Sequence, residues 1–287
     1  CICVPIIVFQ FCRGKEFFSK EYWGYALRIG IPIVPHYLSG IILNQGDRIM
    51  IDKMVGKTEV ALYGLAYSIG MLVQLFISGM NSALTPWMYS KIKKGDIRSM
   101  RKVLQLLSIV VVGIAVALML ISPELVLIFG SPKYREAVYV IPPVAASVFF
   151  IFIYNILSMP QFYYEKTQFL MVASMAAAGV NVVLNFIFIR LFGYIAAGYT
   201  TLACYMLYSV GHYIVSKRIL VNEGIQENLM NPGFLLACSV FLIGASIICN
   251  LIFPYRLLRY AILLASAGLV FWKKELLLKT MADIRKK

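Results

Sequence analysis

The chain has 287 residues, of which 61% are hydrophobic and only 14% are charged, and its formal net charge is +14. A soluble domain is roughly 45–50% apolar with about 25% charged residues, so this composition excludes an ordinary soluble protein. The basic residues lie at the ends of long, non-alternating apolar runs. This arrangement is typical of membrane-spanning helices and argues against nucleic-acid binding. We therefore predict an all-α polytopic membrane protein.

The chain begins with a short apolar segment, CICVPIIVFQFC. A bilayer helix needs about 20 apolar residues, so this segment is too short to cross. It also has no initiating Met, no basic region and no cleavage site of a signal peptide. We interpret 1–12 as the end of a transmembrane helix whose beginning is missing, and 13–24 as a cytoplasmic linker.

Eight apolar runs of about the length of a bilayer follow, and each is predicted to be a transmembrane helix. They cover 26–50, 60–83, 103–122, 138–160, 168–190, 194–215, 233–253 and 257–272. The segment 84–102 lies between the second and third runs and combines Trp87 with a basic stretch. This combination predicts an interfacial helix lying on anionic headgroups. We expect 219–232 to be a cytoplasmic loop, 233–272 an accessory helix pair and 273–287 a basic cytoplasmic tail.

The distribution of basic residues predicts the orientation, because cytoplasmic loops are enriched in Lys and Arg. With 13–24 inside and the helices alternating, 19 of the 27 basic residues lie inside, 7 lie outside and Arg48 lies within a span. This imbalance predicts a cytoplasmic C-terminus.

The first full span carries charge near its end, in the pair Asp47-Arg48. His36, Gly40, Asn44 and Arg48 recur every four residues and therefore share one helix face, with Asp47 three residues past Asn44. Charge inside a bilayer is costly and usually faces a partner, a cavity or a translocation path. Two interpretations remain open: Arg48 faces an anionic substrate, or the pair is an ion pair near the outer interface with Arg48 reaching toward water.

Pro32 and Pro35 are expected to bend or break the first full span. Other spans also carry polar stripes. Such stripes either bond helices to each other or line a shared hydrophilic cavity, and their recurrence on sequential helices favours the cavity. For His36 and His212 a packing role is favoured over a role as proton carrier. The stripes comprise Tyr63, Tyr67, Gly70, Gln74, Ser78 and Asn81 in one span, Ser174, Asn181 and Asn185 in another, and Thr201, Tyr205, Tyr208 and His212 in a third.

No enzyme signature is readable: the sequence has no Walker A motif, no H-E-x-x-H and no G-x-S-x-G. The six cysteines lie in apolar stretches without metal-ligand spacing, so we predict neither a metal site nor a resident cofactor. Coupling to an ion or proton stays open.

The segment IPIVPHYLSGIILNQGDRIMIDKMVGKTEVALYGLAYSIGML, followed by NSALTPWMY, resembles the polysaccharide transporter family. These are Wzx-like flippases of lipid-linked oligosaccharides for O-antigen or capsule, in the MOP superfamily together with the MATE exporters. The segment NVVLNFIFIRLFGYIAAGYTTLACYML is similar to the family's paired helices late in the second lobe. The resemblance covers about residues 22–220.

The resemblance implies two six-helix lobes around a central cavity, of which 25–218 would be the C-terminal lobe and the N-terminal lobe would be a missing partner. It implies transport of undecaprenyl diphosphate-linked oligosaccharide across the cytoplasmic membrane by alternating access, with cationic cavity residues drawing in the diphosphate. Further partners would be the bilayer and other polysaccharide-assembly membrane proteins. The candidate cavity residues are Arg48, Asp47, Asn44, His36, Tyr67, Gln74, Asn81, Asn181, Asn185 and Tyr205.

Two alternatives remain. A MATE-like ion-coupled multidrug exporter would favour an unpaired intramembrane carboxylate, for which Asp47 is the candidate. A membrane glycan polymerase or ligase would need a large external loop with catalytic residues, and the longest predicted external loops, near 51–59 and 123–137, are short for that role.

The predicted orientation can be tested with single cysteines introduced at Lys94, Lys286 and Lys133 in a background without other reactive thiols. An impermeant thiol reagent added to intact cells should label position 133 and leave positions 94 and 286 unlabelled until the cells are opened. Labelling of position 94 from outside would contradict the orientation.

Overall fold

A computed structural model describes residues 3–14 and 18–272, and this part of the chain is helical, with no strand. The all-α polytopic architecture is therefore confirmed. In chain order the elements are α1 (Cys3–Gly14), α2 (Lys20–Met54), α3 (Lys57–Gly70), α4 (Leu72–Lys93), α5 (Ile97–Phe129), the 3₁₀ helix η1 (Pro132–Val140), α6 (Ile141–Tyr163), α7 (Gln168–Phe192), α8 (Ile195–Asn222), α9 (Pro232–Ile252) and α10 (Arg256–Trp272).

Six helical stretches of the described chain are long and apolar enough to cross a membrane, compared with the eight predicted. The run 194–215 lies in α8, whose mean hydropathy is reduced by four tyrosines and a histidine. The run 257–272 lies in α10, which has 17 residues. The six stretches are Lys20–Met54, Lys57–Lys93, Ile97–Phe129, Pro132–Tyr163, Gln168–Phe192 and Pro232–Ile252.

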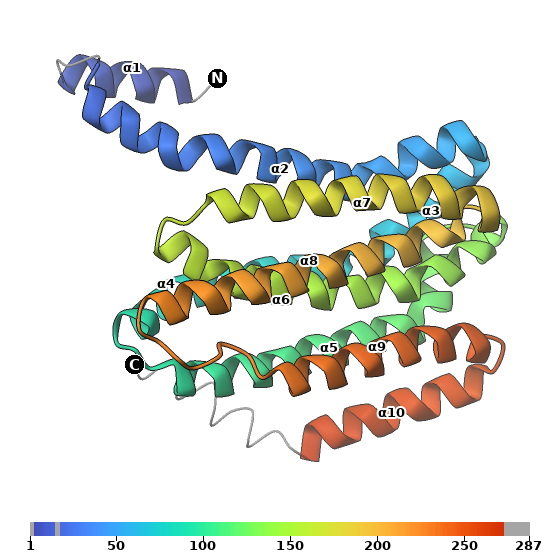
Figure 1. Cartoon of the computed structure of the whole chain (residues 1–287). Helices are drawn as coiled ribbons and strands as arrows, with labels where there is room; N and C mark the ends of the chain where they lie inside the picture. The colour runs from blue at the N-terminus through green and yellow to red at the C-terminus, as the bar shows by residue number, and fades with distance from the viewer. Residues whose placement is uncertain (1–2, 15–17, 273–287) are drawn as a thin grey trace.

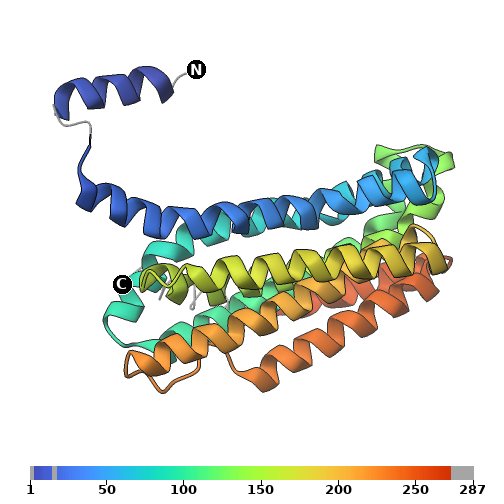
Figure 2. The same ribbon diagram turned by 45° about the horizontal axis from the view of Figure 1, so that its top comes forward.

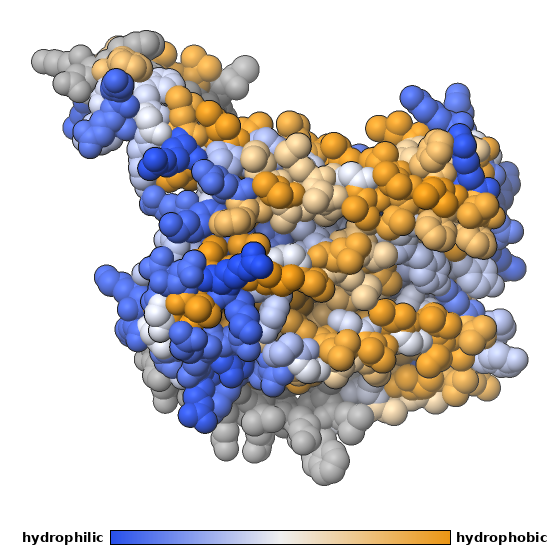
Figure 3. Space-filling view, in the orientation of Figure 1, coloured by the Kyte–Doolittle hydropathy of each residue, from blue (hydrophilic) through white to orange (hydrophobic). Residues whose placement is uncertain are grey.

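The long helices run side by side, with their connections gathered at the two ends of the bundle (Figures 1 and 2). Helix α6 is buried along almost its whole length, whereas α2 and α9 leave much of their apolar surface exposed. Figure 3 shows a hydrophobic band between two hydrophilic ends. This is the surface expected of a protein whose middle lies in lipid and whose ends lie in water.

Several helices extend beyond the apolar runs that predicted them. Helix α2 starts inside the segment expected to be the linker 13–24, and α8 ends at Asn222, inside the segment expected to be the loop 219–232. Hydropathy detects only the part of a helix that lies in the hydrocarbon, so its polar ends escape the prediction. Helix α2 also continues through Pro32 and Pro35 and curves along its length without a break (Figure 1).

The break occurs instead in the second predicted span, 60–83, which the structure divides into α3 and α4 at Met71. A Cβ atom added at Gly70 would lie 2.6 Å from Cγ1 of Val144, so the end of α3 packs directly on α6 at this glycine. The polar stripe predicted along this span is therefore interrupted at Met71.

The expectation of an interfacial helix over 84–102 was wrong. Helix α4 continues through Trp87 to Lys93, and α5 begins at Ile97 after a tight connection. Trp87 is half-buried and packs against the hydrophobic core. The aromatic and basic residues that suggested an interfacial helix are thus the ends of two bundle helices.

Asp96 stabilises the connection between α4 and α5. Its carboxylate accepts hydrogen bonds from Nζ of Lys91 at 2.6 Å and from the backbone N–H of Ser99 at 3.3 Å, which caps the N-terminus of α5. The hydrogen bond from Lys91, together with that from Ser99, lowers the pKa of Asp96 to about 2.

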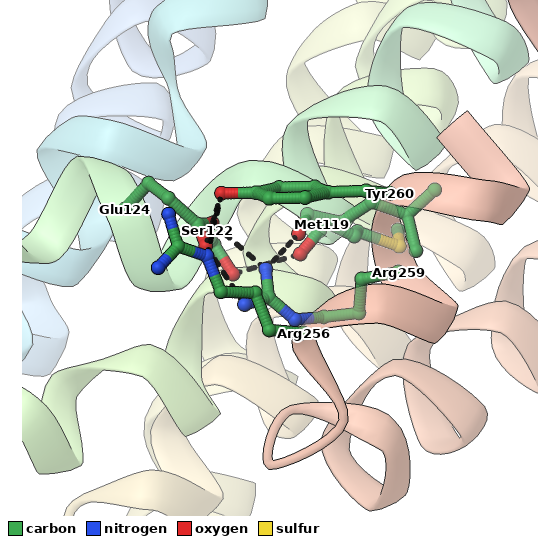
Figure 4. A network of polar contacts seen from close by, with 7 residues as sticks. Met119, Ser122, Glu124, Arg256, Arg259 and Tyr260 are labelled. Carbon is green, nitrogen blue, oxygen red and sulfur yellow. Dashed lines mark hydrogen bonds and ion pairs between the residues drawn. The ribbon is translucent and has the colours of Figure 1, made fainter. Parts of the chain in front are cut away.

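An ion pair holds α10 against α5 (Figure 4). The guanidinium of Arg259 donates to both carboxylate oxygens of Glu124, at 2.7 and 2.8 Å, and to the backbone carbonyl of Leu120 at 2.6 Å. The hydroxyl of Tyr260 donates to the same carboxylate at 3.0 Å. Because Arg259 is only 3% exposed, its charge depends on this carboxylate for compensation.

Replacing Glu124 with Ala should therefore destabilise the protein by about 3 kcal/mol, the lower end of the cost of leaving one member of a buried pair alone. The measurement is thermal unfolding in detergent. The matched control is Arg256→Ala, since Arg256 is exposed and its hydrogen bond within the described chain is to the hydroxyl of Tyr260, at 3.2 Å. Equal melting temperatures for the Glu124 and Arg256 variants would show that the pair does not hold α10.

Candidate functional site

A cavity of about 760 Å³ lies between α2 and helices α3, α6, α7 and α8. This volume is within the range of about 300–1,000 Å³ that ligand sites occupy. Its lining is rich in tyrosine, and among the described residues Arg48 is the only Lys, Arg, Asp or Glu that lines it. The cavity therefore combines apolar and polar side chains with one fixed positive charge.

Arg48 projects from α2 into this cavity. Its guanidinium carbon lies 5.4 Å from the centroid of the Tyr67 ring, a cation–π arrangement. In the part of the chain that the structure describes, no carboxylate forms an ion pair with Arg48, and its buried Nε has no hydrogen-bond partner. The cation is thus positioned by an aromatic ring and left available to an anion.

Asn44 lies one helical turn from Arg48 and is fixed by two tyrosines. The hydroxyl of Tyr67 donates to its Oδ1 at 2.6 Å, and that of Tyr205 donates to the same atom at 3.4 Å. Its own amide donates to the carbonyl of Gly40 at 2.7 Å. These bonds connect α2, α3 and α8 along the cavity wall.

Asp47 faces away from the cavity and is fully buried. Its carboxylate accepts three hydrogen bonds, from the hydroxyl of Tyr63 at 2.5 Å, Nδ2 of Asn185 at 2.6 Å and the hydroxyl of Thr201 at 2.7 Å. The interpretation of Asp47-Arg48 as an ion pair was wrong. Consecutive residues on a helix point about 100° apart, so the two side chains lie on different faces of α2.

The network around Asp47 extends through two asparagines of α7. Asn185 donates to Asn181 Oδ1 at 3.1 Å and accepts a hydrogen bond from Thr200. All of these side chains are buried. The network therefore joins α2, α3, α7 and α8 through neutral donors around one carboxylate.

The ten predicted site residues fall into three groups. The cavity is lined by Arg48, Asn44, His36, Tyr67 and Tyr205. The buried network contains Asp47, Asn181 and Asn185. Gln74 and Asn81 belong to neither group, because they lie on α4, beyond the break at Met71.

Sequence reasoning missed the contribution of α6. Tyr154, Asn155 and Ser158 line the cavity from this helix. Their spacing of three and four residues was a readable signal. It was overlooked because most of the other residues of α6 are apolar.

Polar and charged side chains that face a cavity inside a membrane bundle commonly mark a substrate or ion pathway. Comparison with known families agrees: the family model described as MatE matches residues 32–187, more than half of the chain, from α2 to α7. The chain belongs to the MatE family, whose members are membrane transporters of the MOP superfamily.

Two proteins of Haemophilus influenzae are similar to the chain. "Lsg locus putative protein 1" is 29% identical over 166 residues, covering 54% of this chain and 40% of that protein. "Uncharacterized membrane protein" is 29% identical over 167 residues, with the same coverage of 54% and 40%. The chain thus matches less than half the length of these curated relatives. No solved structure matches the chain.

The buried network predicts a large effect of losing its carboxylate. Asp47→Ala would leave the donors of Tyr63, Asn185 and Thr201 unpaired, at roughly 1–3 kcal/mol for each buried group. The variant should therefore unfold at a markedly lower temperature in detergent, and Asp47→Asn should be milder because it keeps one acceptor.

The matched control is Asp52→Ala, which removes an exposed carboxylate of the same helix. If the Asp47 and Asp52 variants were equally stable, Asp47 would not hold the four helices together.

Proposed function

We propose that the chain is one lobe of a flippase that moves undecaprenyl diphosphate-linked oligosaccharide from the inner to the outer leaflet of the cytoplasmic membrane by alternating access. The observation that carries this proposal is Arg48, the one fixed charge of a tyrosine-rich cavity, which has no carboxylate partner in the described chain. The finer substrate assignment also rests on the resemblance of 22–220 to Wzx-like flippases.

Arg48 suits a diphosphate for physical reasons. A guanidinium stays charged in a low-dielectric site and forms two parallel hydrogen bonds with phosphate oxygens. The Tyr67 ring lies beside the guanidinium, whose buried Nε has no hydrogen-bond partner among the described residues. An anion that enters would provide the partner that the buried Nε lacks.

The other half of the translocation path would come from a second lobe. Helix α2 leaves large apolar side chains exposed, among them Ile31, Val34 and Leu38, on a helix that also lines the cavity. A cavity bordered by an uncovered apolar helix suits a partner lobe that closes it. We assign this role to an N-terminal lobe. We also place the C-terminus on the cytoplasmic side of the membrane.

The alternative is a MATE-like exporter of small cations, and Asp47 is the observation in its favour. In that case a carboxylate would be expected to face the ligand, but Asp47 is fully buried against three neutral donors and does not line the cavity. We therefore assign the ligand contact to Arg48 and a structural role to Asp47. A polymerase or ligase has less support, because the described connections between helices are short.

The test is Arg48→Ala in the full-length protein. Loss of a charge-assisted contact in a partly desolvated site costs about 1.5–3 kcal/mol, which corresponds to a roughly ten- to hundredfold loss of transport. Arg48→Lys should restore export only in part, because an ammonium is a point charge. The measurement is surface polysaccharide, normalised to the amount of protein in the membrane.

The matched control is Arg190→Ala. Arg190 also stacks on an aromatic ring, with its guanidinium carbon 3.9 Å from the Phe186 centroid, but it is exposed and outside the cavity. Normal export by the Arg48→Ala variant would refute the proposal. Loss of resistance to cationic drugs with normal polysaccharide would instead support the multidrug alternative.

A further inference from the structure

A row of tyrosine rings leads away from Arg48 along the cavity. The ring of Tyr67 lies beside Arg48. The hydroxyls of Tyr67 and Tyr205 converge on Oδ1 of Asn44, at 2.6 and 3.4 Å. The ring of Tyr205 is in turn nearly parallel to that of Tyr154, with centroids 6.3 Å apart and an angle of 8° between the planes. Helices α3, α8 and α6 thus present three rings to one space.

Tyr208 continues this row beyond Tyr154, with the two ring centroids 4.6 Å apart. Its hydroxyl lies 3.1 Å from Nδ1 of His36, and its ring meets that of His212 edge to face, with centroids 4.5 Å apart. His36 and Arg48 lie twelve residues apart on α2, which corresponds to about 18 Å along the helix. The tyrosine row, which we define as Tyr67, Tyr205, Tyr154 and Tyr208, therefore follows the cavity from one end of this stretch of α2 to the other.

Amide side chains with unused hydrogen-bonding capacity line the same cavity. Asn155 follows Tyr154 on α6 and is half-buried. Ser158 donates to the backbone carbonyl of Asn155 at 2.8 Å, and within the described chain the Asn155 side-chain amide is left without a hydrogen bond. Gln45 lines the cavity from α2, and its side chain is exposed. A ligand in the cavity would thus meet flat aromatic surfaces together with hydrogen-bond donors and acceptors.

This combination of surfaces is the one that a sugar ring requires. The C–H groups on one face of a pyranose carry partial positive charge, and the face of an aromatic ring is the negative part of its quadrupole, so the two faces attract each other. The hydroxyls around the edge of the sugar both donate and accept hydrogen bonds, as a carboxamide does. An isoprenoid chain would cover the rings but leave the amide of Asn155 unpaired, which is unfavourable away from water.

We propose that the tyrosine row is a sugar-binding subsite, in which the ring of Tyr154 stacks on a sugar and the amide of Asn155 binds its hydroxyls. The inference rests on the proposed function, in which Arg48 holds the diphosphate, and it assigns the remainder of the cavity to the carbohydrate. The sugar bonded to the diphosphate lies next to Arg48, and further sugars follow along the row. Tyr154 is the central member of the row, because it contacts both Tyr205 and Tyr208.

The test is saturation-transfer NMR with the full-length protein in lipid nanodiscs. The probe is the oligosaccharide released by partial acid hydrolysis from the surface polysaccharide of the cells that make the protein, so it carries neither lipid nor diphosphate. Saturation of aromatic protons should transfer to C–H protons of a sugar ring in the wild-type protein and in Tyr154→Phe, which keeps the ring. In Tyr154→Leu the affinity obtained by titration should fall roughly two- to tenfold, the value of one aromatic contact.

The matched control is Tyr163→Leu. Tyr163 lies on the same helix and is also half-buried in an aromatic pair, with its ring centroid 5.4 Å from that of Tyr89, but it does not line the cavity. This variant should bind the oligosaccharide as the wild type does. A second variant, Asn155→Ala, leaves all rings in place and should weaken binding roughly fivefold through the lost hydrogen bond.

The sugar and the diphosphate are separated by a second probe, farnesyl diphosphate, which carries no sugar. Tyr154→Leu should bind it as the wild type does, and Arg48→Ala should bind it more weakly. No binding of the oligosaccharide by the wild-type protein, or equal binding by the wild type, Tyr154→Leu and Asn155→Ala, would overturn the inference and leave the proposed function intact. Weaker binding of farnesyl diphosphate by Tyr154→Leu would assign the row to the lipid carrier and overturn the inference as well. Normal export by Arg48→Ala, with the oligosaccharide still bound, would overturn the proposed function and leave the sugar subsite.

Discussion

The buried carboxylate of Asp47 is the constraint on which the arrangement of the cavity depends. A carboxylate in a membrane bundle must have its oxygens satisfied, because water is absent and an unpaired charge would be very costly. Here three neutral donors, from α3, α7 and α8, converge on it. Since each donor sits on a different helix, the carboxylate fixes how α2 is rotated relative to all three.

That rotation decides which side chains of α2 face the cavity. With Asp47 turned into the bundle, the stripe of His36, Asn44 and Arg48 faces the open space. Asn44 is then held by tyrosines of α3 and α8, and Arg48 by the ring of Tyr67. Arg259 differs from Arg48, because the carboxylate of Glu124 pairs with its guanidinium and the contact holds α10 against α5. Because no carboxylate of the described residues pairs with Arg48, the cavity keeps a net positive charge.

Much of the fold could be read from the sequence. Apolar runs of bilayer length located most of the helices, and spacing of three and four residues identified the cavity face of α2, because both patterns are properties of a single helix. The errors arose where one helix meets another. The break at Met71 accompanies the close approach of Gly70 to α6, and the supposed interfacial segment is the junction of two packed helices. The polar residues of α6 were hidden within its apolar sequence.

The sequence by itself determined that the protein is a helical membrane protein and roughly where its spans lie. It also determined that one span contains the charged residues Asp47 and Arg48. Only the tertiary structure decided that Asp47 and Arg48 have separate partners, that Gln74 and Asn81 lie away from the cavity, and that both histidines meet at Tyr208. Helical periodicity specifies which residues of one helix share a face. It does not specify which face of another helix lies opposite, because that depends on side-chain packing between residues far apart in the chain.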